Sequence, residues 1–136
     1  MMSNEEAAQQ YYMQFQQIQQ HIKQTQHQME GIEQHMMEAV VAKNGIDELE
    51  KAKIGDELLV PLTSGIFIKA SLLNNSEVLM NVGSRTVVTK DFKKARKLLE
   101  GQIEEMQKVQ KNLGNQLQQL IMQARAIEHE MQKVME

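Results

Sequence analysis

The amino-acid sequence predicts a mainly α-helical protein with a small β part, in which two long helices form an antiparallel coiled coil and two β-hairpins are inserted between them. Three observations lead to this fold class: a composition poor in core-forming residues, a heptad pattern at each end of the chain, and a β-rich segment between the two. Only 41% of the 136 residues are hydrophobic and 4% are aromatic. With a single proline and no cysteine, this composition suits long helices better than a globular core.

The N-terminal helix is predicted over residues 5–53. Apolar or small side chains recur there at alternate spacings of four and three residues, which places them on one seam of a helix. The seam comprises Tyr11, Phe15, Ile18, Ile22, Thr25, Met29, Ile32, Met36 and Ala39. The pair Asn44–Gly45 is a typical helix stop signal, so the pattern leaves open whether the helix runs through it.

The C-terminal helix is predicted over residues 91–135 from a second seam with the same spacing. This seam comprises Leu99, Ile103, Met106, Gln110, Leu113, Leu117, Leu120, Ala124, Ile127, Met131 and Val134. Facing residues of an antiparallel pair have numbers with a constant sum. A sum of 142, as for Tyr11 with Met131, fits along the whole interface, and a sum of 149 fits equally well, so both registers remain open.

Two polar residues, Thr25 and Gln110, interrupt the seams. A buried polar seam residue fixes the register of a coiled coil at a cost in stability, whereas tolerated partial exposure would have no such effect, and the sequence leaves both interpretations open. Gly31, Gly101 and Gly114 lie inside the predicted helices, where each costs roughly 1 kcal/mol relative to alanine. We therefore expect the helical arms to be somewhat pliable.

The segment 57–89 is predicted to form two β-hairpins, because β-branched and aliphatic residues cluster there between turn residues. The strands are expected near residues 58–62, 66–73, 78–82 and 86–89. Pro61 lacks a backbone N–H, so it belongs on the open side of a strand or at a bulge. So small a sheet has open edges and is marginal alone, which favours oligomerisation through it.

The segment Leu59-Val60-Pro61-Leu62 and the following Gly65-Ile66-Phe67-Ile68-Lys69-Ala70 resemble the Leu-Val-Pro motif and next strand of the alpha class of the prefoldin family. Val82-Gly83 and the stretch Phe92 to Ala95 fit as well, and the resemblance covers the whole chain. The beta class has a single hairpin in this position, so the longer insert favours alpha. Thr63 and Arg85 stand where the family usually has glycine, so the conformations of those two turns do not follow from the resemblance.

The resemblance implies a heterohexamer of two alpha and four beta subunits, whose hairpins assemble into a β-barrel platform that carries six coiled-coil arms. It further implies an ATP-independent chaperone, a holdase without cofactor, that captures unfolded proteins among the arms and delivers them to a group II chaperonin. The alternative from another class is a structural coiled-coil scaffold or filament-forming protein that holds no clients.

Two sets of candidate site residues follow. Off-seam apolar residues near the shared end of the two helices suit the capture of unfolded chains, because methionine adapts to many shapes. These tip residues are Met1, Met2, Tyr12, Met13, Ile121, Met122 and Met135. The candidates for the oligomer interface, the hairpin residues, are Val60, Leu62, Ile66, Phe67, Ile68, Val78, Leu79, Val82, Val87 and Val88. The alternative interpretations are scattered surface methionines and frayed helix ends for the first set, and internal hairpin packing for the second.

Other classes of function find little support. No P-loop and no grouping of nucleophile, base and oxyanion site is recognisable, so we expect neither an enzyme nor a nucleotide site. The four histidines never lie three or four residues apart, which disfavours a metal site. The run Lys90, Lys93, Lys94, Arg96 and Lys97 is expected to be a solvated face and not a nucleic-acid site. No stretch predicts a membrane span or a signal peptide, so we expect a cytoplasmic protein.

Overall fold

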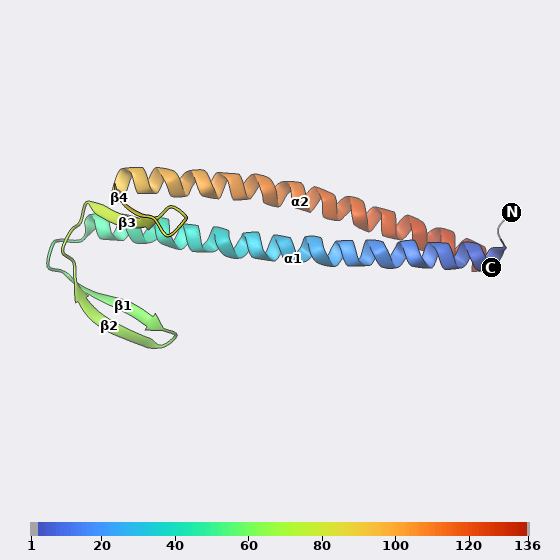
Figure 1. Ribbon diagram of the computed structural model, residues 1–136, viewed down its shortest axis with the longest axis horizontal. Helices are drawn as coiled ribbons and strands as arrows, with labels where there is room; N and C mark the ends of the chain where they lie inside the picture. The colour runs from blue at the N-terminus through green and yellow to red at the C-terminus, as the bar shows by residue number, and fades with distance from the viewer. Residues whose placement is uncertain (1–2, 136) are drawn as a thin grey trace. The chain divides into compact units, whose positions relative to one another are not determined.

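The computed structural model describes residues 3–135 and consists of two helices joined by two β-hairpins (Figure 1). Along the chain, the elements are α1 (Asn4–Lys51), β1 (Glu57–Thr63), β2 (Ile66–Ser71), β3 (Glu77–Asn81), β4 (Val87–Asp91) and α2 (Phe92–Met135). The predicted fold class is thereby confirmed. The chain divides into two compact units, which we call the arm unit (Met1–Met36 with Glu105–Glu136) and the hairpin unit (Met37–Glu104).

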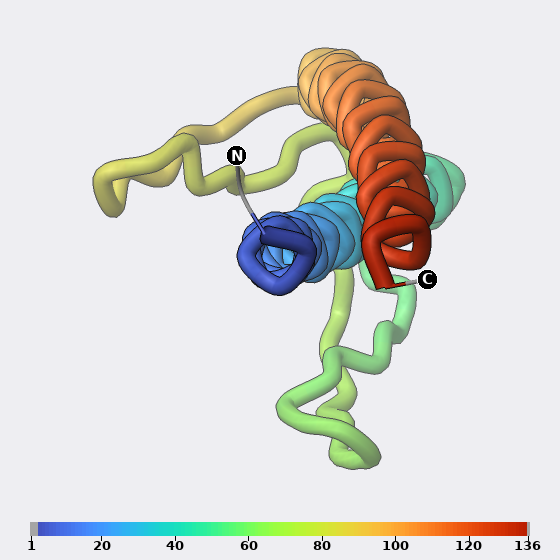
Figure 2. Tube along the Cα trace, turned by 90° about the vertical axis from the view of Figure 1, so that its right-hand side faces the viewer, coloured from blue at the N-terminus to red at the C-terminus, as the bar shows by residue number. Residues whose placement is uncertain are grey.

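In the arm unit, the two helical segments run antiparallel, and the start of α1 lies beside the end of α2 (Figures 1 and 2). Every predicted seam residue of this unit is buried or half-buried, whereas the positions between them are mostly exposed. Leu120 and Ala124 retain less than a tenth of their surface. The heptad periodicity therefore identified the packed face of each helix.

The register is the one in which facing residue numbers add up to about 142. In the arm unit, Ile32 lines one groove together with Val109 and Leu113 of α2. In the hairpin unit, the Lys43 ammonium lies 3.3 Å from the Glu100 carboxylate. The alternative sum of 149 would shift each partner by one heptad, or about 10 Å along a helix, too far for these contacts.

Thr25 is 2% exposed, so the seam does bury this polar residue. Its hydroxyl donates a hydrogen bond of 2.9 Å to the backbone carbonyl of His21, one turn earlier in the same helix. Because the bond stays within α1, the buried hydroxyl is satisfied without any group of α2. Thr25 therefore does not specify the register, and Gln110 is only half-buried.

The hairpin unit has a small core in which both helices take part. Ile46 of α1 is buried, as are Phe92, Ala95 and Leu99 of α2. The burial of Ile46 explains why α1 continues through Asn44–Gly45 to Lys51, because tertiary packing outweighs a local stop signal.

The start of α2 is fixed by the side chain of Asp91. Its carboxylate accepts a 2.7 Å hydrogen bond from the backbone N–H of Lys94, the arrangement of an N-cap. Five residues later, the Arg96 guanidinium bonds to the carboxylates of Asp47 and Glu50 on α1. The bonds to Glu50 and Asp47 raise the pKa of Arg96 above its ordinary value, because both favour the charged guanidinium.

The two hairpins form separate two-stranded antiparallel sheets. In the first, Val60 faces Ile68 and Pro61 faces Phe67, and the pairing shifts between Pro61 and Thr63. Pro61 thus sits beside an irregularity of the ladder, where its missing N–H is tolerated. In the second, Met80 faces Val88. No helix among residues 3–135 has an apolar stretch long enough to cross a bilayer.

The turn between β3 and β4 is strained. Gly83, Ser84 and Arg85 have φ angles of 108°, 50° and 59°, so three successive residues lie in the region that favours glycine. The backbone N–H of Thr86 closes the turn on the carbonyl of Gly83 at 2.9 Å. Arg85 therefore keeps the left-handed conformation although a Cβ disfavours it. Thr63, by contrast, has no positive φ, and the β1–β2 turn relies on Gly65 at 84°.

We predict that Arg85→Gly raises the free energy of unfolding by about 0.5 to 1 kcal/mol. A left-handed residue with a Cβ costs about 1–2 kcal/mol, and the greater conformational entropy of glycine in the unfolded chain cancels part of the gain from removing that cost. Urea denaturation followed by circular dichroism measures the change. Arg85→Ala is the matched control, since it removes the side chain but keeps the Cβ, and it should give no gain. Equal stability of Arg85→Gly and the parent chain would show that the turn is unstrained.

Candidate functional site

The tip residues that the structure describes are mostly solvent-exposed. Tyr12 is 52% exposed, Met13 64%, Met122 69% and Met135 76%. Ile121 is half-buried, which fits the alternative that it widens the core of the arm. Met1 and Met2 lie outside the described residues. Four large apolar side chains are thus accessible on the arm unit without belonging to its packed seam.

The structure does not bring these side chains into one patch. In the observed register, Met122 of α2 lies level with Gln20 of α1. Seven residues, or about 10 Å of helix, separate that level from Met13. The exposed apolar groups are therefore spread along the last turns of the arm, which suits contact with an extended chain better than with a compact ligand.

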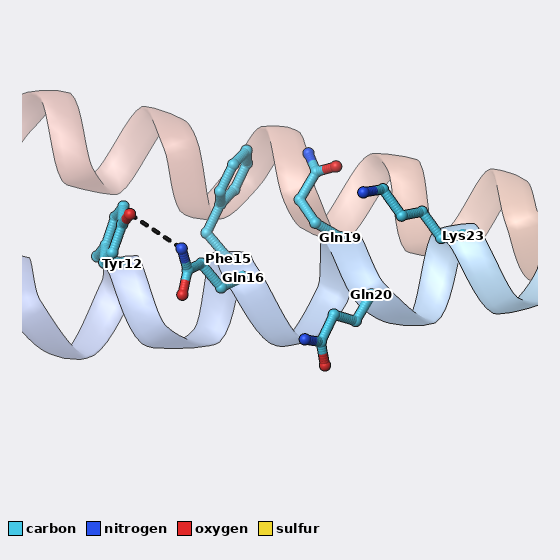
Figure 3. A pocket seen from close by; sticks show the side chains of 6 residues that line it. All are labelled: Tyr12, Phe15, Gln16, Gln19, Gln20 and Lys23. Carbon is cyan, nitrogen blue, oxygen red and sulfur yellow. Dashed lines mark hydrogen bonds between the residues drawn. The ribbon is translucent and has the colours of Figure 1, made fainter.

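A groove on α1 of the arm unit, which we call the glutamine groove, was missed by the sequence reasoning because most of its residues are polar. It measures about 360 Å³ and is lined by Tyr12, Phe15, Gln16, Gln19, Gln20 and Lys23 (Figure 3). The Gln16 side-chain amide donates a 2.9 Å hydrogen bond to the hydroxyl of Tyr12. The groove could have been found in the sequence from its two sets of residues at four-residue spacing, Tyr12, Gln16 and Gln20 in one set and Phe15, Gln19 and Lys23 in the other.

Exposed apolar residues also occur on α1 within the hairpin unit, and the sequence reasoning did not single them out. Met37 is 62% exposed and Val41 is 69% exposed, although their neighbours Met36 and Ala39 belong to the seam. Met37 follows a seam position directly and Val41 is two residues past one. The heptad pattern alone therefore predicts that both side chains face solvent. Their exposure marks a second apolar strip, separate from the tip residues.

Most hairpin residues are exposed. In the β1–β2 hairpin, Val60 and its partner Ile68 are 39% and 46% exposed and share a face with Leu58 and Ala70. Most of the remaining hairpin residues are at least half exposed: Leu62, Ile66, Phe67, Leu79, Val82 and Val87. These exposed aliphatic side chains are available for contact with another subunit.

Val78 and Val88 behave differently from the other hairpin residues. Both are half-buried, and they share the inward face of the β3–β4 hairpin with Met80. The alternative interpretation, packing within the subunit, therefore applies to these two positions. Leu79, on the opposite face of β3, is 74% exposed.

Charged groups form no centre of reactivity in the structure. Within residues 3–135, no three histidine, aspartate or glutamate side chains gather closely enough to hold a metal ion. Of the basic run, Arg96 is committed to Asp47 and Glu50, whereas Lys93 and Lys94 lie exposed in the first turn of α2. The chemically distinctive surfaces of the chain are therefore its apolar side chains and the glutamine groove.

The chain was compared with known families and structures. The family described as prefoldin subunit matches residues 5–136. A prefoldin subunit alpha from Methanococcus aeolicus is 31% identical over 132 residues, covering 87% of this chain and 89% of that protein. Another from Methanococcus vannielii is 26% identical and covers 84% and 76% of the two chains. A chain of the filamentous PFD from Methanocaldococcus jannaschii has a TM-score of 0.56 at 18% identity, covering 92% and 98%, and shares the fold.

The exposures predict an order of methionine oxidation. Limited treatment with hydrogen peroxide should convert Met13, Met122 and Met135 to sulfoxides well before the half-buried seam residues Met29 and Met106, because a sulfur must be accessible to react. Peptide mapping by mass spectrometry measures the order. Met37, exposed in the hairpin unit, is the control and should react with the first group. Equal rates at Met13 and Met29 would contradict the packing of the arm.

Proposed function

Because the chain belongs to the prefoldin family, we propose that it is a subunit of an ATP-independent chaperone that holds unfolded proteins at the ends of its coiled-coil arms. The observation that supports this most directly is the exposure of Tyr12, Met13, Met122 and Met135 on an arm whose own seam is already packed. Accessible side chains of this kind are available for contact with an apolar partner. Unfolded chains offer the matching apolar surface.

The arm suits capture without a fixed binding shape. Methionine side chains are flexible and polarizable, so they fit many apolar partners equally well. Each contact is made by a single side chain, so no one contact has to hold a client alone. Several arms in one assembly would hold a client together, because the second contact forms at a high effective concentration once the first exists. This mode of binding requires neither nucleotide hydrolysis nor a cofactor.

The hairpins are the proposed assembly surface. An isolated two-stranded hairpin is marginally stable in water, and this chain has two that form separate sheets. Pairing with hairpins of neighbouring subunits would satisfy the open strand edges and cover both faces of the first hairpin, one with Val60 and Ile68 and the other with Phe67. We propose a heterohexamer of two such subunits with four prefoldin beta subunits around a β-barrel platform. The assembly would work in the cytoplasm and deliver its clients to a group II chaperonin.

A structural filament is the second candidate. The likeness to the fold of the filamentous PFD chain favours it, and the open hairpin edges would permit it. The two functions place different requirements on the arm ends. Client binding requires exposed apolar side chains there, whereas a filament does not require exposed methionines. Mixing the chain with a prefoldin beta subunit separates them. The chaperone predicts a discrete hexamer by light scattering that suppresses aggregation of a denatured protein without ATP.

Substituting the exposed tip methionines tests client binding. The triple variant Met13→Ser, Met122→Ser and Met135→Ser should keep the mass of the assembly but need at least about tenfold more of it for equal protection, because one buried methionine contributes about 1.5 kcal/mol. A double control, Met37→Ser with Val109→Ser, removes exposed apolar groups elsewhere and should protect normally. If the triple variant suppresses aggregation as well as the parent chain does, the proposed role of the tip residues is wrong.

A charge on the first hairpin tests assembly. Phe67→Asp should lower the assembled mass, because a carboxylate at a position that is 56% exposed in the free chain would be buried between subunits. Lys69→Gln is the control, since its side chain lies on the same face of β2 and is 80% exposed. Circular dichroism confirms that both variants keep their helices. An intact hexamer with Phe67→Asp would remove Phe67 from the interface.

A further inference from the structure

The glutamine groove is built from two parallel rows of side chains on α1. Tyr12, Gln16 and Gln20 form one row and Phe15, Gln19 and Lys23 the other, each at a spacing of four residues. Such rows are the ridges of a helix surface, and the space between them is a groove. In Figure 3, Phe15, Gln19 and Lys23 extend above the ribbon of α1, Tyr12 and Gln16 are joined by their hydrogen bond, and Gln20 points below it. From Tyr12 to Lys23 the groove is about 16 Å long, which corresponds to about five residues of an extended chain.

Two of the amide groups in the groove are free to bind a partner. The Gln16 amide is engaged with Tyr12, whereas no hydrogen bond of the Gln19 or Gln20 side chain occurs within residues 3–135. Each of these amides offers both a donor and an acceptor, as a peptide group does. The aromatic ring of Tyr12 is half exposed beside them. The groove thus combines an apolar wall with groups that match a polypeptide backbone.

Lys23 is a cation with no carboxylate near it. On α1, the positions three and four residues away are Gln19, Gln20, Gln26 and His27, so no helical neighbour can pair with it. In the observed register, Lys23 lies level with residue 119 of α2, and positions 116–123 contain no acidic residue. Its positive charge is therefore available to a partner.

We propose that the glutamine groove takes an extended segment of an unfolded client that carries a carboxylate side chain, with Gln19 and Gln20 bonding its backbone and Lys23 pairing with its acid. This inference rests on the proposed holdase function and adds a preference among clients. A helix of another subunit is a poorer occupant, because its backbone groups are already bonded internally and would leave the amides unmatched. An unfolded chain has unpaired N–H and C=O groups, which can form hydrogen bonds with the amides of Gln19 and Gln20.

The first test uses two synthetic peptides with the same apolar residues, one with two glutamates and the other with two glutamines in their place. The assembled chaperone should bind the glutamate peptide about three- to fivefold more tightly at low salt, a ratio ordinary for an exposed ion pair, and the preference should fade as salt is added. Lys23→Gln should abolish the preference. Lys111→Gln is the matched control, because Lys111 is exposed on α2 and also makes no ion pair within residues 3–135.

The second test locates the contact. A carbodiimide joins a carboxylate directly to a lysine amine as an amide, with loss of water, so it marks only pairs in contact. Mass spectrometry should find the glutamate peptide attached at Lys23 and not at Lys111. Attachment at both lysines alike, or a preference that survives Lys23→Gln, would overturn the proposal. So would a loss of assembled mass in Lys23→Gln, which would make the groove a contact between subunits.

The two proposals fail in different ways. If the wild-type assembly suppresses aggregation but binds both peptides equally, the preference for acidic clients is wrong and the holdase function stands. If it binds neither peptide and suppresses no aggregation, both are wrong. Suppression of aggregation with a glutamate preference that disappears in Lys23→Gln supports both.

Discussion

A packed seam only one side chain wide joins the helices, and most other properties of the chain depend on it. Each helix presents a single apolar position per turn, so pairing two helices leaves the rest of each surface in water. Even within the seam, most residues are only half-buried, and Thr25 is tolerated because its hydroxyl bonds within its own helix. A two-helix arm has no interior in which to hide further apolar residues. Tyr12, Met13 and Met122 remain accessible for this reason.

In the hairpin unit, ion pairs between the helices supplement a small apolar core. Where α1 ends and α2 begins, Ala95 is fully buried but small, so it contributes little apolar area. Arg96 bonds to both Asp47 and Glu50, and Lys43 lies beside Glu100. These pairs add directional contacts that an aliphatic seam lacks. They help to hold the register at the point where the chain leaves the helices for the hairpins.

Periodicity was sufficient to predict the seams and the hairpins, because each reflects a repeat that the side chains must obey. Choosing between the registers required contacts such as Lys43 with Glu100, since a heptad shift leaves the seam pattern unchanged. The continuation of α1 past Gly45 depended on the burial of Ile46 against distant residues, which a local stop signal ignores. The glutamine groove was missed because it is polar, and the search for a binding surface had followed apolar residues.

A chaperone that relied on apolar contact alone would hold its clients and its own neighbours by the same force. Amide side chains alter this balance, because they bind a backbone best where its own hydrogen bonds are missing. In the proposed binding mode, Gln19 and Gln20 would therefore distinguish unfolded from folded chains by a property that hydrophobicity does not report. Placing them beside the half-exposed ring of Tyr12 lets one surface test for both properties at once. An arm too thin to enclose a client would gain selectivity in this way without a cavity.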